Sequence, residues 1–437
     1  MARILVKERT VSKKNSAMKR NAETRKSVPP NKATPKNKAN SSQTLFKNLK
    51  LAAQDFKSTQ EKMAFIIENE KFVWIGPQNK IPKNLKPQKE HDLKNQLVFP
   101  SFIESHTHSI FAGSRAAEFE MRNTGVSYLE IAQKGGGILS TMRKTREALP
   151  ADLLKKTQNH VDQFLKQGVS TLEIKSGYAL DLKNEIKLLQ VVQKLKGPTR
   201  FIPTFLGAHA LPPEFKTHAE YLNYLATKVL PEIKKQQLAQ RVDIFIENKF
   251  FEADTAEKFL IEAQKQGFQL TIHANQLSLS GGVDLALKLQ AQSADHAIHL
   301  TDDLVKKFSQ SKTVAVLLPA ADLYMKCAYP PARKLLDAGA TVALATDFNP
   351  GTCPTQDLAL VGLLARLEMK MTLPEVFTAY TKSAAKALGI DHEEGEIAVN
   401  KRANFISTNA DLEDFFYSAG YTPDHLLFIC GDRVKRT

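Results

Sequence analysis

Two histidines separated by one residue, His106 and His108, are the clearest sign of chemistry in the sequence. They follow a short apolar run at 102–105, and on an extended chain residues i and i+2 point to the same side, so both imidazoles can reach one ion. His273 and Asp347 also end apolar runs, much later in the chain. Imidazole and carboxylate ligands without thiolate suit zinc, iron or a similar ion. We predict that these four residues form one metal site, although a histidine in such a position more often has a structural role.

A metal ion in such a site has clear chemistry. It lowers the pKa of a bound water to roughly 7 and polarises the carbonyl group that the water attacks. Asp347 can bind the ion, accept the proton of that water and deliver it to the leaving nitrogen. His296 ends a further apolar run and can stabilise the oxyanion or move a proton, and a structural role for it stays open. The residues therefore predict metal-dependent hydrolysis with Asp347 and His296 as catalytic groups.

Short apolar runs alternate with spans of helical periodicity from residue 100 onward, and the predicted helices are 151–167, 183–195, 216–235, 254–266, 280–290, 302–309, 331–338, 357–369 and 374–388. This alternation predicts parallel β/α units, and eight of them predict a closed (β/α)8 TIM-type barrel. An open doubly wound sheet is the alternative, but it usually has a glycine-rich turn after its first strand, and none is present there. In a barrel the carboxyl ends of the strands form the active-site face, where the four candidate ligands fall. The predicted strands are 102–105, 170–174, 201–206, 242–246, 269–272, 293–297, 314–318 and 341–345.

Both ends of the chain have a different texture, with short alternating runs separated by Gly, Asn and Pro. Such runs are typical of a small antiparallel β unit. We predict that residues 43–99 and 396–437 together build one small β-sandwich module beside a barrel of residues 100–395. The strand candidates are 45–51, 63–67, 71–76 and 96–100 near the start, and 395–399, 403–407 and 425–430 near the end.

The formal charge of +15 is concentrated in residues 1–42, which hold twelve Lys and Arg against two Glu. This segment has few large apolar side chains and is expected to be a disordered basic tail. Nucleic-acid binding is not expected outside it. The three cysteines lack CxxC spacing, and the sequence shows neither a signal peptide nor an apolar run of about 18 residues. These features favour a cytoplasmic protein without a membrane segment.

The motif PSFIESHTH at 100–108, with His273, His296 and Asp347, resembles the amidohydrolase superfamily. Other blocks are similar, more narrowly, to the imidazolonepropionase family: FAGSRAAEFEMR at 111–122, GGGI at 135–138, EIKSGY at 173–178, TFLGAH at 204–209 and DFNPGT at 347–352. The resemblance extends from about residue 45 to the end of the chain. It implies hydrolysis of the cyclic amide of 4-imidazolone-5-propanoate to N-formimidoyl-L-glutamate in histidine degradation, by a homodimer with one zinc or iron ion per subunit.

Matching positions carry the site residues of that family onto this sequence. A guanidinium such as that of Arg115 suits the propionate of the substrate. Arg115 can instead form an exposed ion pair with Glu118 or Glu120, and Tyr128 can serve packing alone. The resemblance implies His106, His108, His273 and Asp347 as metal ligands, and Arg115, Tyr128, Tyr178, His209, Gln276, Asn349, Gly351 and Thr352 as substrate contacts.

Two departures and two alternatives complete the prediction. Gln276 stands where some relatives carry Glu, and an amide cannot act as a base, so acid–base chemistry is left to Asp347 or His296. Binuclear members carry a carboxylated lysine on the fourth strand, which ends here at Glu247, so one ion is expected. Another cyclic amidase or a nucleobase deaminase is the alternative enzyme, although Arg115 favours an anionic ring. A non-catalytic barrel for assembly or nucleic-acid binding should have lost metal ligands, and all four are present.

Overall fold

The structure is a computed structural model that describes residues 42–52, 56–126, 130 and 136–435. Nearly all of the predicted tail lies outside the described residues, and so does Tyr128. Contacts along the chain group Ser42–Thr437 into one compact unit. All described strands and helices belong to this unit.

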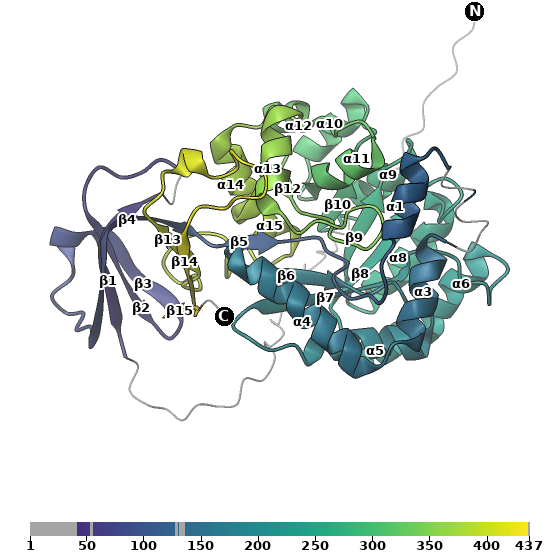
Figure 1. Cartoon of the computed structure of the whole chain (residues 1–437), viewed down its shortest axis with the longest axis horizontal. Helices are drawn as coiled ribbons and strands as arrows, with labels where there is room; N and C mark the ends of the chain where they lie inside the picture. Colours follow the sequence, from purple (N-terminus) through teal and green to yellow (C-terminus); the bar gives the residue numbers. More distant parts are fainter. Residues whose placement is uncertain (1–41, 53–55, 127–129, 131–135, 436–437) are drawn as a thin grey trace, which may run out of the picture. The chain divides into compact units, whose positions relative to one another are not determined.

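Eight parallel strands form the larger sheet, and each pairs with its neighbour in chain order. Nearly all of their residues are buried, as expected for strands with helices outside and packed side chains inside. Every strand predicted from an apolar run is present, and the TIM-type barrel is confirmed (Figure 1). The strands are β5 (Phe102–Glu104), β6 (Val169–Lys175), β7 (Arg200–Ala208), β8 (Arg241–Ile246), β9 (Gln269–Ala274), β10 (Ser293–His296), β11 (Val314–Leu317) and β12 (Val342–Leu344).

Amphipathic helices follow the strands. In α4, Leu153, Thr157, Val161 and Phe164 are buried at spacings of three or four residues, so one apolar stripe faces inward. Within the described ranges, no helix has both the length and the apolar character needed to cross a bilayer. The helices that the periodicity predicts are α4 (Pro150–Lys166), α5 (Leu182–Gln193), α6 (His218–Tyr224), η2 (Leu225–Val229), α7 (Leu230–Lys235), α8 (Ala253–Lys265), α9 (Gly282–Lys288), α10 (Asp302–Ser309), α12 (Ala332–Asp337), α13 (Leu358–Leu367), α14 (Leu373–Tyr380) and α15 (Lys382–Ala387).

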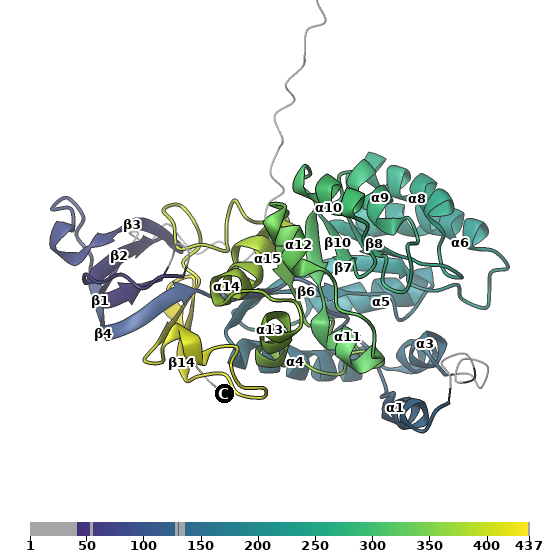
Figure 2. The same cartoon turned by 90° about the horizontal axis from the view of Figure 1, so that it is seen from above.

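Among the described residues, apolar periodicity misses three helices, α1 (Ala116–Asn123), α3 (Ile138–Glu147) and α11 (Pro319–Met325). Helix α1 contains no buried residue, so it lacks the stripe by which a helix is recognised. Helix α11 has only seven residues, too few for a periodic pattern. Helices α1 and α3 lie beside each other, and Glu118 of α1 accepts a hydrogen bond from Gly137 at the start of α3 (Figure 2).

The barrel closes between its first and last strands through a short seam at their carboxyl ends. His108 N donates to Phe348 O at 2.9 Å, and Asp347 N donates to His106 O at 3.1 Å. The buried carboxylate of Glu104 reinforces the seam because it accepts the N–H of His106 and that of the residue before Asp347. The seam therefore fixes three predicted metal ligands side by side.

Both chain ends build the second sheet, in which strands of the first hundred residues lie beside strands of the last forty (Figure 1). Phe46 of β1 packs against Phe405 and Phe428 across the intervening strand β4, so strands from both chain ends share one aromatic core. The order β15-β14-β13-β4-β1-β2-β3 contains β1 (Thr44–Leu51), β2 (Met63–Glu68), β3 (Lys71–Pro77), β4 (Lys89–Pro100), β13 (Phe405–Thr408), β14 (His425–Ile429) and β15 (Asp432–Arg433), with short 3-10 turns at η1 (Gln78–Lys80) and η3 (Leu412–Asp414).

Two details of this module differ from the prediction. The sheet is mixed rather than antiparallel, because the connection through 78–88 returns the chain to the start of β1 and β4 then runs parallel to β1. The predicted strand at 395–399 is wrong. Gly395 and Asn400 have φ values of 91° and 71°, which end any extended segment between them. A side chain at Gly395 would meet Ala385 at 2.7 Å, so this glycine allows the chain to pass closely over α15.

Candidate active site

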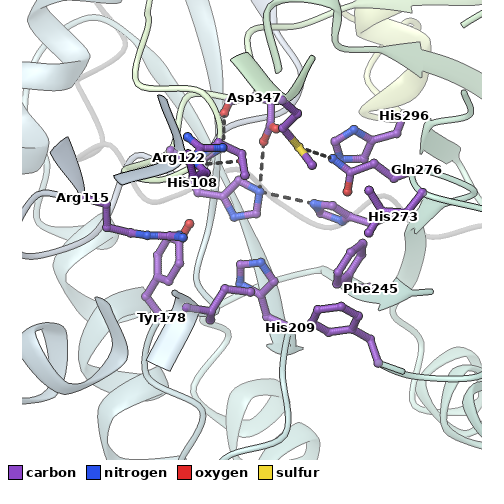
Figure 3. Close-up of a pocket in the computed structure, with 16 residues that line it drawn as sticks. His108, Arg115, Arg122, Tyr178, His209, Phe245, His273, Gln276, His296 and Asp347 are labelled. Atoms are coloured by element: carbon purple, nitrogen blue, oxygen red, sulfur yellow. Dashed lines mark hydrogen bonds and ion pairs between the residues drawn. The ribbon is translucent and has the colours of Figure 1, made fainter. Parts of the chain in front are cut away.

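The four predicted metal ligands converge at the carboxyl ends of β5, β9 and β12. His106 Nε2 and His108 Nε2 each lie 3.4 Å from Asp347 Oδ1, and His273 Nε2 lies 3.3 Å from His108 Nε2. All four side chains are buried, and Figure 3 shows three of them facing a common point. Ligand atoms about 2.0–2.1 Å from a tetrahedral zinc ion lie about 3.3–3.4 Å from one another. The residues therefore fit a metal ion.

Hydrogen bonds fix the orientation of two of these histidines. His106 Nδ1 lies 2.6 Å from Asp295 Oδ2, and His273 Nδ1 lies 3.1 Å from Asp243 Oδ1. An Nδ1 that donates to a carboxylate leaves Nε2 as the unprotonated, metal-binding nitrogen. His106 Nε2 is buried without a hydrogen-bond partner, which is the state expected of a nitrogen reserved for an ion.

Buried carboxylates beside His106 favour positive charge at the site. Burial and the Lys175 ammonium act to lower the pKa of His106, but Asp295 and Asp347 outweigh them and raise it to about 9. A divalent cation between His106 and Asp347 satisfies the same preference. The electrostatics of the site and the types of ligand atom therefore both favour a bound cation.

His296 lies close enough to the predicted ligands to share a metal site with two of them. Among the described residues, the groups that can hold a metal are His106 with His108 and Asp347, and His106 with His273 and His296. Burial lowers the pKa of His296 to about 4, so its imidazole is neutral at pH 7. His296 and Asp347 also adopt left-handed backbone conformations, with φ values of 72° and 54°. Such strain is common where the chain redirects a functional side chain.

The ligands open into a cavity of about 340 Å³. Among the predicted substrate contacts it is lined by Arg115, Tyr178, His209, Gln276, Asn349 and Thr352. In Figure 3 the arginines lie on one side of His108, and His273, His296 and Gln276 lie on the other. The cavity is also lined by residues that sequence reasoning did not single out as site residues: Arg122, Ile138, Phe245, Phe250, Leu277 and Met325.

Two guanidinium groups give the cavity an anion-binding side. Arg115 pairs with Glu118 at 2.7 Å, but the arginine is buried rather than exposed as the alternative has it, and it also lines the cavity. Arg122 Nη2 donates to Gly351 O at 3.2 Å. A Cβ on Gly351 would lie 2.0 Å from Arg115 Nη1, so Gly351 does not line the cavity itself but makes room for the arginine that does. The FEMR part of the 111–122 motif was the signal that could have identified Arg122.

His209 and Tyr178 form the wall next to His108. Their rings lie 5.2 Å apart, and His209 stacks on His108 at the same distance. Burial lowers the pKa of His209 to about 3, and its Nδ1 lies 3.0 Å from Gly177 O. The neutral ring therefore donates through Nδ1 and leaves Nε2 as an acceptor for a ligand N–H. Glu185 holds this loop because its buried carboxylate accepts three backbone N–H groups, including that of Gly177.

The remaining predicted contacts have partners of their own. Asn349 Oδ1 accepts the backbone N–H groups of Gly351, Thr352 and Cys353, and its Nδ2 donates to Asp347 O. Asn349 therefore shapes the loop that follows Asp347 as well as lining the cavity. Gln276 Nε2 lies 3.4 Å from the sulfur of Met325, a weak partner that a ligand can replace.

Asp322 in α11 gives a prediction about stability. Its carboxyl is buried, Oδ2 has no hydrogen-bond partner, and burial together with nearby Asp347 raises its pKa to about 8. Between about pH 4 and pH 8 the folded state holds a proton that the unfolded chain has lost, so stability falls as pH rises through this window. Asp322→Asn cannot ionise, so we expect its advantage in free energy of unfolding to grow with pH, reaching on the order of 3 kcal/mol, with a matching rise in Tm relative to the parent chain.

Melting curves at pH 5, 6.5 and 8 check this expectation. Asp337→Asn is the matched control, because Asp337 is an exposed carboxylate that pairs with Arg333. A Tm difference between Asp322→Asn and the parent chain that stays constant with pH would contradict the expectation.

Comparison with known proteins places the chain in a family. The model of the amidohydrolase family matches residues 97–433, and the chain belongs to that family. Imidazolonepropionase of Bdellovibrio bacteriovorus is 54% identical over 383 residues, which cover 87% of this chain and 90% of the relative. Imidazolonepropionase of Fusobacterium nucleatum is 41% identical over 355 residues, which cover 80% and 86%. Within the amidohydrolases, the chain is a member of the imidazolonepropionase family.

Solved structures share the fold at much lower identity. An adenosine deaminase from Xanthomonas campestris with bound zinc aligns with a TM-score of 0.68 and 15% identity over 90% of this chain and 93% of its own. A guanine deaminase from C. acetobutylicum aligns with a TM-score of 0.66 and 15% identity over 90% and 100%. At this identity the likeness shows the architecture alone.

Proposed function

We propose that the chain hydrolyses 4-imidazolone-5-propanoate to N-formimidoyl-L-glutamate in histidine degradation, with one zinc or iron ion per subunit. The observation that carries this proposal is a cavity in which a metal-ligand set meets two arginine side chains. Identity of 54% to a relative named imidazolonepropionase supports the same substrate. Two guanidinium groups favour an anionic ring over the uncharged nucleobase of a deaminase, the alternative enzyme.

The substrate is held by groups of opposite character on the two sides of the cavity. Arg115 binds the propionate through charge-assisted hydrogen bonds, and Arg122 adds a second positive charge next to it. His209 accepts a ring N–H through its free Nε2, and the hydroxyl of Tyr178 can bond a ring heteroatom. The aromatic rings of Phe245 and Phe250 supply an apolar wall against the imidazolone plane.

The reacting end of the substrate lies at the ligand set. His106, His108, His273 and Asp347 would hold the ion, which when bound supplies Lewis-acid activation of water and of the ring carbonyl. Asp347 takes the proton of the attacking water and returns it to the ring nitrogen as the C–N bond breaks. His296, neutral and beside the ligands, stabilises the negative charge that develops on the carbonyl oxygen.

A coupled assay tests the proposal. Urocanase and urocanate generate the unstable substrate in the cuvette, absorbance follows loss of the imidazolone ring, and mass spectrometry identifies formimidoyl-glutamate. We expect turnover that a chelator abolishes and that zinc or iron, added separately, restores. Guanine and adenosine, with ammonia release as the readout, test the deaminase alternative. A folded, metal-loaded sample that leaves imidazolone propionate intact would overturn the substrate assignment.

Gly351→Ala probes how the anion-binding side is built. The added methyl group would collide with the guanidinium of Arg115 and displace it from the cavity. We expect KM to rise by about tenfold, in line with the loss of a charge-assisted hydrogen bond worth about 1.5 kcal/mol, while kcat changes less. Gly76→Ala is the control, because the added methyl group would meet only the side chain of Trp74, in strand β3 outside the barrel. A KM unchanged in Gly351→Ala would contradict this account.

The proposal also covers where the protein acts. All three cysteines are free thiols in the structure, and free thiols suit the reducing cytoplasm. A homodimer remains a prediction.

A further inference from the structure

A buried lysine lies beneath the candidate metal centre. Lys175, the last residue of β6, is 0% exposed. Its Nζ lies 2.9 Å from Glu173 Oε1, 2.9 Å from Asp243 Oδ2 and 3.7 Å from Asp295 Oδ2. Burial acts to lower the pKa of Lys175, but these three carboxylates raise it overall, so the group is an ammonium ion at neutral pH.

Two of the three carboxylates are those that orient metal ligands. Asp243 of β8 bonds Nδ1 of His273, and Asp295 of β10 bonds Nδ1 of His106. Among the described residues, Lys175 is the one lysine or arginine in ion-pair contact with either aspartate. The Lys175 ammonium therefore links the two aspartates that orient metal ligands from two different strands.

We propose that Lys175 is a positioning residue for the metal centre. Its ammonium holds Asp243 and Asp295 in the places from which they fix the rings of His273 and His106, with both Nε2 atoms turned to the ion. The inference rests on the metal site of the proposed function. It assigns to Lys175 a role that neither the ligand set nor the substrate contacts include.

The geometry explains why a cation is needed at this point. Asp243 and Asp295 stand on alternate strands on either side of β9, and both reach the same ammonium inside the barrel. Without the Lys175 ammonium, the two buried carboxylates of Asp243 and Asp295 would repel each other, and their side chains would rotate away from each other. Each aspartate would then leave its histidine ring without a fixed partner, and a misdirected Nε2 weakens the bond to the ion.

The test compares metal binding by the full-length parent chain, Lys175→Met and a control. Lys187→Met is the matched control, because Lys187 also donates three hydrogen bonds, to the partly buried carbonyls of Thr145, Arg146 and Ala148, and none of these residues is a metal ligand or one of its supports. Zinc affinity is measured by competition with a chelator, and the visible d–d spectrum of the cobalt-substituted protein reports the ligand geometry. A lysine with only a structural role would not change that spectrum.

We expect Lys175→Met to bind zinc at least about tenfold more weakly and to show an altered cobalt spectrum, with Lys187→Met like the parent. Asp295→Asn alone should weaken binding too, and the losses in Lys175→Met and Asp295→Asn should not add in the double variant, because both act on His106. Parent-like affinity and spectrum in a folded Lys175→Met, or additive losses, would overturn the inference.

Two further results keep the test decisive. If Lys175→Met does not fold, Asp243→Asn and Asp295→Asn decide the matter, and parent-like zinc affinity in both would overturn the inference. If the parent chain itself binds none of zinc, cobalt and iron, the proposed function fails as well. A parent that binds metal and hydrolyses the substrate, alongside an unaffected Lys175→Met, rejects the role of Lys175 alone.

Discussion

Asp347→Asn is expected to reduce metal-dependent hydrolysis by at least about a thousandfold in kcat, because the change removes both an anionic ligand and the proton acceptor. Asp347 Oδ1 lies 3.4 Å from the Nε2 atoms of His106 and His108, so the amide would occupy the same place without the charge. Steady-state rates in the coupled urocanase assay measure the loss. Metal content, determined on the same samples, shows how much of it reflects binding.

The control for this variant is Asp337→Asn, which makes the same chemical change at an exposed ion pair with Arg333. It should keep the parent rate and metal content. Asp347→Asn that retains both metal and more than about a tenth of the parent kcat would show that a different residue accepts the proton. His296 would then be the first candidate, since it lies within reach of the ligands.

Arg115→Met is the second substitution from which a large effect is expected, and its effect should fall on substrate binding. The methionine keeps an apolar stem in the cavity but cannot pair with the propionate. Loss of two charge-assisted hydrogen bonds, together about 3 kcal/mol, predicts a rise in KM of about 100-fold with a smaller change in kcat. Metal content should stay at the parent level, because Arg115 is not one of the predicted metal ligands and pairs with Glu118.

Arg333→Met serves as the comparison, since Arg333 also pairs with a glutamate, Glu375, but does not line the cavity. Its KM should match that of the parent chain. An unchanged KM in Arg115→Met would mean that Arg122 alone binds the carboxylate, and Arg122→Met would then show the missing effect.

The barrel and the metal ligands could be predicted from the sequence for related reasons. The parallel strands are buried and most of them contain a short apolar segment, and polar residues at their carboxyl ends, such as His273 and His296, lie at the active-site face. His106 and His108 add period-two spacing to this pattern. The structure brings together all four predicted ligands, and only Tyr128 among the predicted contacts lies outside the described residues.

Features that depend on partners far away in the sequence could not be predicted. Lys175 ends a strand as an ordinary charged residue would, and its significance appears only when Asp243 and Asp295 meet it inside the barrel. Residues 89–95 of β4 are mostly exposed and lack alternation, and they are extended because they pair with β1. Helix α1 has no buried residue, so no periodic signal marked the element that carries Arg122.

The pairing of β4 with β13 has a consequence for how the chain is made. Ser407 of β13 donates to Gln96 of β4, 311 residues earlier, and β5 with the first metal ligands follows β4 almost at once. During synthesis the ribosome therefore releases β4 long before its partner strand β13 exists. One edge of β4 must wait, unpaired, until nearly the whole barrel has emerged, and such long-range pairing is slow and open to wrong contacts. The sheet from which the first metal-binding strand leads is therefore completed only when the last strands of the chain have been made.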